Sequence, residues 1–155
     1  MRKTRGFIFA ALIAVGCKSE PSTPPAAQGQ VQLARAADGQ IELQLRDVDV
    51  ASKALQVEIL VSGDEAYTIE TVQPAEGLSL NAVRARMQGT NRAVVFVGDT
   101  RGVRLPTTGA VARFTVEPVS SSANSGARIS LGSVLLVGPG GDAIPTRSGP
   151  SISAR

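Results

Sequence analysis

The stretch GQIELQLRDVDVASKALQVEILVSG, residues 39–63, decides the fold of this chain. Apolar and polar residues alternate in IELQL at 41–45 and again in LQVEILV at 55–61. Successive side chains of a strand point to opposite faces of a sheet, so this period predicts two β-strands that each bury one face. The same kind of pattern continues on both sides of the stretch.

Turn signals divide the rest of the chain into further short strands. Asp38-Gly39 predicts a hairpin turn that follows a weaker strand near 31–36. Further strands are predicted at 67–73, 92–97, 110–117, 127–131, 134–137, 143–146 and 151–154, and residues 78–87 are predicted to be a strand or an irregular stretch. Short strands at such spacing are typical of sandwiches. We predict an all-β fold, a single jelly-roll β-sandwich of about nine strands over residues 31–155.

The amino terminus has the pattern of an export signal. Arg2, Lys3 and Arg5 precede an uncharged apolar stretch, FIFAALIAV at 7–15. As a helix this stretch rises only about 14 Å, and the hydrocarbon core of a bilayer is about 30 Å thick, so it is too short to span a membrane. It has the length of a signal-peptide core, and we expect residues 1–16 to be removed as a signal peptide.

The residues Ala14-Val15-Gly16-Cys17 resemble the lipobox of bacterial lipoproteins, although Ala14 stands where leucine is most usual. The resemblance implies that the Cys17 thiol receives a diacylglyceryl group, that the leader is cleaved, and that the new amino terminus is acylated. The alternative is an ordinary secretory leader with an incidental cysteine. The position of the single cysteine favours the lipoprotein, and two or three acyl chains hold a protein durably on a membrane.

A polar segment separates Cys17 from the predicted sandwich. Residues 17–30 contain three prolines and no aliphatic side chain larger than alanine. Such a segment cannot bury a core, so we expect a flexible tether. Lys18 follows the cysteine, where aspartate favours the inner membrane in lipoproteins of the enteric type. We therefore expect a lipid-anchored protein of the cell envelope, at the outer membrane.

The basic charge of the chain belongs to its leader. The whole sequence has 16 Lys and Arg residues against 13 Asp and Glu, a formal charge of +3. Three of the bases lie in residues 1–16, so the two signs balance in the mature chain. Nucleic-acid binders keep a basic excess on one face, and we expect no nucleic-acid partner here.

The residue inventory argues against catalysis. There is no His, the commonest general base near neutral pH and the commonest nitrogen ligand of metals. One Cys allows neither an internal disulfide nor a cysteine zinc site. The serines have no base in a known motif to activate them. We expect no enzyme activity, no catalytic residue and no cofactor.

Three stretches resemble the opening, middle and end of a cohesin-type domain. They are residues 39–63, residues 91–118 (NRAVVFVGDTRGVRLPTTGAVARFTVEP) and residues 127–154 (ARISLGSVLLVGPGGDAIPTRSGPSISA). The resemblance lies in strand rhythm and turn placement. Cohesins are nine-stranded sandwiches that bind dockerin modules, so the resemblance implies this fold and a non-catalytic, adhesive role.

The resemblance also implies a class of partner. It suggests a protein-binding or adhesion module in an envelope complex, with another envelope protein as partner. Cohesin-like lipoproteins of gliding and social bacteria extend this expectation to adhesion or gliding motility. The alternative is a carbohydrate-binding module for wall or matrix polysaccharide, from which the sequence departs with one Tyr and no Trp. A glycosidase, which needs two carboxylates across a cleft, is a third alternative.

Charge is segregated along the mature chain. Residues 38–76 contain nine acids and two bases, and residues 84–113 contain six arginines and one acid. One interpretation is an Arg-rich face for a carboxylate-bearing partner, because guanidinium pairs with carboxylate in bidentate fashion. The other, which we favour, is that acidic and basic strands lie side by side and pair within the sheets.

The loop DTRGVRLPTT at 99–108 is the candidate contact surface. It offers Arg101 and Arg104 for acidic groups, and Val103 and Leu105 as apolar residues that the core does not require. Loops on a rigid sandwich are common binding elements. The alternative is a plain connector.

Asp47 and Asp49 are the one candidate pair for a metal. On a strand they point the same way, and calcium seeks oxygen ligands. No loop supplies the six or more oxygens that calcium needs in a recognisable spacing. We therefore expect no metal site.

Overall fold

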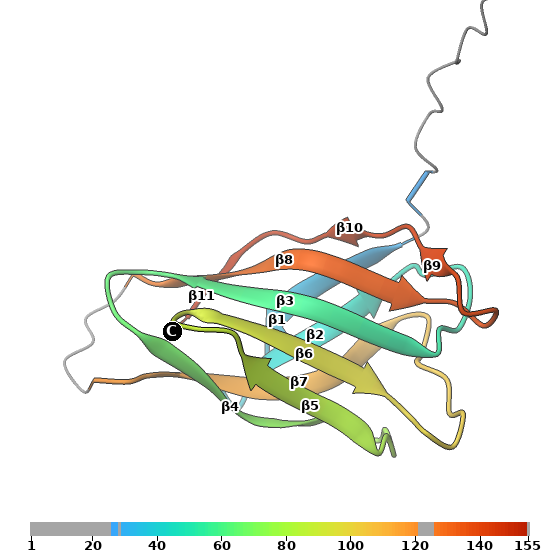
Figure 1. Ribbon diagram of the computed structural model, residues 1–155, viewed down its shortest axis with the longest axis horizontal. Helices are drawn as coiled ribbons and strands as arrows, with labels where there is room; N and C mark the ends of the chain where they lie inside the picture. The colour runs from blue at the N-terminus through green and yellow to red at the C-terminus, as the bar shows by residue number, and fades with distance from the viewer. Residues whose placement is uncertain (1–25, 28, 121–125, 155) are drawn as a thin grey trace, which may run out of the picture.

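Figure 1 shows the computed structural model of the chain, which describes residues 26–27, 29–120 and 126–154. The predicted signal peptide 1–16, Cys17 and most of the predicted tether lie outside the described residues. The described residues contain strands, turns and irregular connections. This part of the chain has no helix with the length and hydropathy to cross a bilayer.

The strands of the described chain form two sheets. The strands are β1 (Gln30–Arg35), β2 (Ile41–Arg46), β3 (Ala54–Ser62), β4 (Tyr67–Pro74), β5 (Ala82–Met87), β6 (Arg92–Gly98), β7 (Gly109–Pro118), β8 (Arg128–Val137), β9 (Ala143–Ile144), β10 (Arg147–Ser148) and β11 (Ile152–Ser153). One sheet has the order β10-β1-β2-β7-β4, and the other has β11-β8-β3-β6-β5 with β9 beside β8. The sheets stack face to face (Figure 1), so the predicted all-β sandwich is confirmed.

The core lies between the two sheets and comes from the predicted alternation. Every second residue of β2 and β3 is buried, and Phe114 of β7 is the largest side chain with no exposed surface. Burial of one such large apolar side chain contributes roughly 1.5–3 kcal/mol. Further residues with no exposed surface are Val31, Leu43, Leu45, Leu55, Val57, Ile59, Val95, Val97, Ile129 and Leu136.

The predicted hairpin turn joins β1 to β2. Gly39 has a φ of 85°, which a residue without a Cβ adopts without strain. The Asp38 carboxylate accepts a hydrogen bond of 3.0 Å from the Gln40 amide, and the Ala36 amide donates to the Gln40 carbonyl at 2.9 Å. The two strands then pair antiparallel over their whole length.

Two bulges change the predicted strands. Residues 127–131 and 134–137 were expected as separate strands, but they form the single strand β8, whose register against β3 shifts near Gly132 and Ser133. In β7 the register against β2 shifts at Val111, so Val111 and Ala112 are both fully buried although they are consecutive. One extra residue in a strand reverses which side chains face the core.

The ends of the sheets also differ from the prediction. Of residues 78–87, only 82–87 form a strand. The chain after β8 forms the short pieces β9, β10 and β11, where longer final strands were expected at 143–146 and 151–154. Of these, β10 pairs parallel with β1 and closes one edge of its sheet. A parallel pairing between the two ends of the chain has no local sequence signal.

Candidate functional site

The outer face of the six-stranded sheet follows from the same alternation as the core. Leu55, Val57 and Ile59 of β3 are fully buried, so Gln56 and Glu58 between them point outward. Residues that face each other in register on neighbouring strands share a side of the sheet. The outward residues of β8, β6 and β5 therefore lie beside Gln56 and Glu58.

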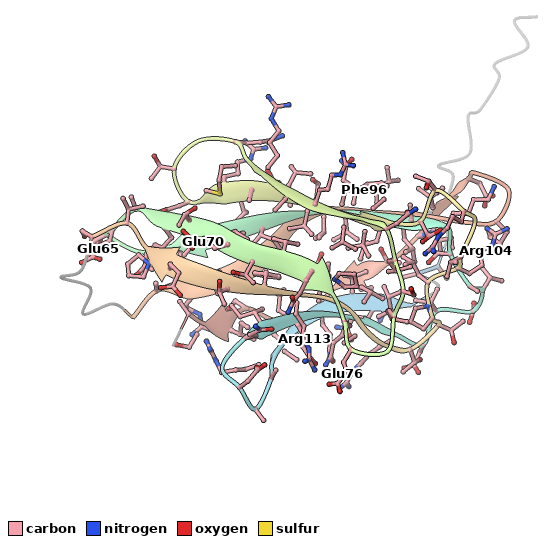
Figure 2. The ribbon with its side chains drawn as sticks, turned by 90° about the horizontal axis from the view of Figure 1, so that it is seen from below. Glu65, Glu70, Glu76, Phe96, Arg104 and Arg113 are labelled. Atoms are coloured by element: carbon pink, nitrogen blue, oxygen red, sulfur yellow. The ribbon has the colours of Figure 1, made fainter. Side chains whose placement is uncertain are left out.

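One row across this outer face carries two exposed apolar side chains. Gln56 of β3 is flanked in register by Leu135 of β8 and by Phe96 of β6, and Phe96 is followed by Arg84 of β5. Leu135 is 44% exposed and Phe96 is 39% exposed. Figure 2 shows Phe96 at the surface of the sandwich. The row thus presents two large apolar side chains to solvent on a regular sheet.

The ring of Phe96 lies against its own strand. A Cβ built on Gly98 would sit 3.1 Å from two atoms of this ring, so the ring covers the bare backbone of Gly98. Ala54, the neighbour of Gly98 on β3, is also small. An aromatic side chain with a defined resting place loses little rotamer freedom when it binds a partner.

The carboxylate of Glu58 accepts hydrogen bonds from the two neighbouring strands of its own sheet. The β8 bulge lies opposite Glu58, where the Ser133 amide donates to its Oε2 at 3.3 Å and Arg92 of β6 donates to its Oε1. The hydrogen bond from the Ser133 amide is the main cause of the lowered pKa of Glu58; desolvation opposes it, and the hydrogen bond and charge of Arg92 lower the pKa further. Glu58 is therefore a charged, paired group that holds the bulge in place.

The outer face of the other sheet has a different character. Gln32 donates to Gln44 at 2.9 Å, and Gln44 donates to Glu42 at 2.8 Å. Glu42 also accepts two hydrogen bonds from Arg113, at 2.8 and 3.0 Å. A second nitrogen of the Arg113 guanidinium lies 3.7 Å from the Glu76 carboxylate, and Figure 2 shows the two residues near each other. These side chains satisfy one another, so this face is polar and internally paired.

In the predicted contact loop at 99–108, the first arginine, Arg101, is hydrogen-bonded within the loop. Asp99 accepts hydrogen bonds from the Arg101 amide at 2.7 Å, from the Arg101 guanidinium at 2.7 Å and from the Asn81 amide at 3.1 Å. These bonds, with the Arg101 side chain first, lower the pKa of Asp99 to about 2. Arg101 also donates to the Ser79 carbonyl, so it fastens the loop to the β4–β5 connection.

The prediction of Leu105 as a contact residue is wrong. Its side chain has no exposed surface and belongs to the core, and its amide donates to the Ser52 carbonyl at 2.8 Å. The loop folds back over the end of the sandwich, and this buries the Leu105 side chain. Val103, 42% exposed, and Arg104 point outward, and Figure 2 shows Arg104 at one end of the molecule, away from Phe96. Their contact with a partner stays a prediction.

Asp47 and Asp49 were expected to lie on a strand, but they follow the end of one. β2 ends at Arg46, and Asp47 has a φ of 50°, which turns the chain away from the sheet. Both carboxylates border an open hollow of about 370 Å³ with Arg46 and Arg147. Within the described ranges, no three His, Cys, Asp or Glu side chains are grouped to hold a metal ion.

Part of the charge that is segregated along the sequence pairs between neighbouring strands. Arg92 of β6 pairs with Glu58 of β3, and Arg113 of β7 pairs with Glu42 of β2 at 2.8 Å. This is the interpretation that we favoured. Arg84 and Arg86 of β5 are exceptions, because neither side chain has an ion pair or a hydrogen bond to another described residue.

Sequence reasoning missed Phe96 and Leu135. Residues 92–97 were predicted as a strand without a division of its faces, and in the structure Ala93, Val95 and Val97 are inside while Phe96 is outside. Alternation counted from Ala93 puts Val95 and Val97 on the same face as Ala93 and Phe96 on the other, and this was the signal in the sequence that Phe96 points outward. Leu135 carried no such signal, because the bulge ahead of it sets its direction.

Solved structures resemble this fold, although no family model and no curated protein matches the sequence. A type I cohesin–dockerin complex from Clostridium thermocellum matches with a TM-score of 0.59 and 16% identity, over 84% of this chain and 94% of that chain. The cohesin module of a family 33 glycoside hydrolase from Clostridium perfringens matches with a TM-score of 0.61 and 13% identity, over 82% and 96%. A non-cellulosomal cohesin from Archaeoglobus fulgidus gives 0.53 and 12%, over 79% and 86%.

This chain has a cohesin-like fold. The likeness covers both sheets and confirms the resemblance that the strand rhythm suggested. At these identities the likeness concerns the fold alone.

Proposed function

We propose that this chain is a non-catalytic protein-binding module that docks a partner on the outer face of its six-stranded sheet. The observation that carries the proposal is the row that holds Phe96 and Leu135 open to solvent on a regular sheet. Aromatic residues are enriched in protein interfaces, and rigid apolar side chains beside polar ones are typical of docking surfaces.

The rest of the surface supports the choice of this face. The outer face of the opposite sheet carries side chains that are bonded to one another, and these contacts would have to break before a partner could use the groups. They are Gln32, Gln44, Glu42, Arg113 and Glu76. The cohesin-like fold adds support, since two neighbours are complexes of a cohesin with a dockerin protein. A protein partner is therefore favoured.

A carbohydrate partner is disfavoured by the positions of the rings. Tyr67 is 4% exposed and Phe114 is fully buried, so Phe96 is the one exposed aromatic side chain in the described ranges. Sugar faces stack on aromatic platforms, and a single phenylalanine in one row with Leu135 suits an apolar protein side chain better.

The location of the module is part of the proposal. The leader and Cys17 support a lipid anchor in the cell envelope, at the outer membrane, with the residues after Cys17 as a tether. A lipid-held binding module suits a subunit of a surface complex, and we propose a part in adhesion or gliding motility. Cys17→Ser tests the anchor by cell fractionation, and a variant that stays in the membrane fraction contradicts it.

Affinity capture tests the docking face. The full chain is recovered from its native envelope after mild crosslinking, and bound proteins are identified by mass spectrometry. Truncation of Phe96 and Leu135 to alanine is expected to weaken capture at least about tenfold, because central apolar contacts carry most interface energy. Val50→Ala, at 42% exposure in the connection between β2 and β3, is the matched control and should leave capture unchanged.

Two outcomes contradict the proposal. One is equal recovery of the partner by the native chain and the double variant, which would place the docking surface elsewhere. The other is saturable binding of a wall polysaccharide that the Phe96→Ala change abolishes, which would favour the carbohydrate alternative.

A further inference from the structure

The strand β5 is an open edge of a kind that the other sheet ends lack. It lies at the end of the six-stranded sheet, beside β6 (Figure 1). Its six residues pair with β6 in an uninterrupted register. Among the other sheet ends, β10 and β11 have two residues each. β4 is interrupted by a register shift at Thr71, whose φ of 50° is rare for a β-branched residue.

The backbone of β5 is accessible at its centre. Arg84, Ala85 and Arg86 are consecutive and all exposed, although successive side chains point to opposite faces of the strand. Solvent therefore reaches both faces of the strand at this point. No other described strand pairs with the far side of β5, so its outward N–H and C=O groups are available to an added strand.

The side chains of β5 set the charge of such an added strand. Arg84 and Arg86 lie two residues apart, so they point to the same face. No acidic residue of the described chain pairs with either one, whereas Arg92 and Arg113 on neighbouring strands have partners. Guanidinium groups pair well with carboxylates, and a segment with acids at alternate positions would match this spacing.

A second copy of this chain does not suit the edge. If two β5 strands paired antiparallel about Ala85, Arg84 of one would face Arg86 of the other. Like charges directly opposite each other destabilise a strand pair. The same arginines that attract an acidic strand therefore discourage self-association through β5.

We propose that the free edge of β5 takes an extended acidic segment of a partner protein as an added strand, with alternate carboxylates against Arg84 and Arg86. The proposal goes beyond the docking face, because it rests on the edge backbone and the two arginines and not on Phe96 and Leu135.

A short blocked peptide that alternates Glu with Thr tests the proposal by titration into the full chain in detergent. We expect saturable binding that weakens as salt is raised. The double change Arg84→Glu and Arg86→Glu should weaken it about tenfold, because two attractions become repulsions. A peptide with Lys in place of Glu should then bind the double variant and not the native chain. This exchange also shows that the variant is folded.

Backbone pairing is tested with a peptide of the same charge that is N-methylated at alternate residues. It should bind at least about tenfold more weakly, because it cannot donate the ladder hydrogen bonds. Equal binding of the methylated peptide would overturn the proposal in favour of simple charge attraction. Self-association of the chain that the double variant abolishes would overturn the choice of occupant. The Phe96→Ala and Leu135→Ala chain should bind the peptide normally, so failure of the docking face and failure of the edge are distinguishable.

Discussion

Replacing Leu105 by alanine tests whether the loop at 99–108 is part of the core. The native side chain has no exposed surface, and the substitution removes three carbon atoms from between the sheets. At about 0.8 kcal/mol per methylene, the transfer term alone is about 2.4 kcal/mol. The cavity left behind raises the expected loss in free energy of unfolding to about 3 kcal/mol.

Urea unfolding of residues 18–155 measures this loss. The midpoint should fall while the slope of the transition stays unchanged, because the change affects stability and not the surface exposed on unfolding. Val103→Ala is the matched control: its side chain is 42% exposed, and the loss should stay within about 0.5 kcal/mol. If Leu105→Ala costs no more than Val103→Ala but reduces partner capture, the placement of Leu105 in the core is wrong.

Three further predictions concern single contacts. Asn91 has a φ of 62°, and its side chain accepts a hydrogen bond from the Tyr67 amide at 2.6 Å and donates one to the Glu65 carbonyl at 2.7 Å. In urea unfolding, Asn91→Ala should lower the free energy of unfolding by about 3 kcal/mol and Asn91→Gly by about 2 kcal/mol. Equal losses would refute the contribution of the backbone conformation. A Cβ on Gly132 would clash with Glu58 Oε2, so Gly132→Ala should lower the urea midpoint in the native chain and not in Glu58→Ala; equal shifts in both would refute the clash. The pKa of Asp99 is lowered from 3.8 to about 2, so its contribution to stability is present above pH 3.8 and is lost as the pH falls through about 2. Asp99→Asn should flatten the acid limb of stability against pH, and an unchanged limb would contradict the pairing with Arg101.

The fold was largely predictable because its information is local. Alternation in residues 41–45 and 55–61 determines which side chains are buried, and Asp38-Gly39 determines a turn by its backbone preferences. The limits of the local pattern appear at Val111 and at Gly132, where one extra residue shifts the register. Such a bulge depends on the partner strand, which the local sequence does not name.

The candidate site was less predictable for the same reason. Arg101 and Leu105 were placed correctly in a loop, but only the packing of that loop on the sandwich gives them internal partners. Phe96 and Leu135 come from strands far apart in sequence, and they share a face only because β3 lies between β6 and β8. Strand order is a tertiary property, and so is any surface that crosses several strands.

By itself, the sequence determined an all-β sandwich, the absence of histidine, a balanced charge after residue 16, and the prediction of a lipid anchor at Cys17. These follow from composition, from period-two patterning and from a contiguous motif, which need no long-range contact. The tertiary structure alone decided that Glu42 and Glu58 pair with arginines of neighbouring strands while Arg84 and Arg86 stay unpaired among the described residues. It also decided that the open edge belongs to β5, because an edge exists only after every other strand has taken its neighbours.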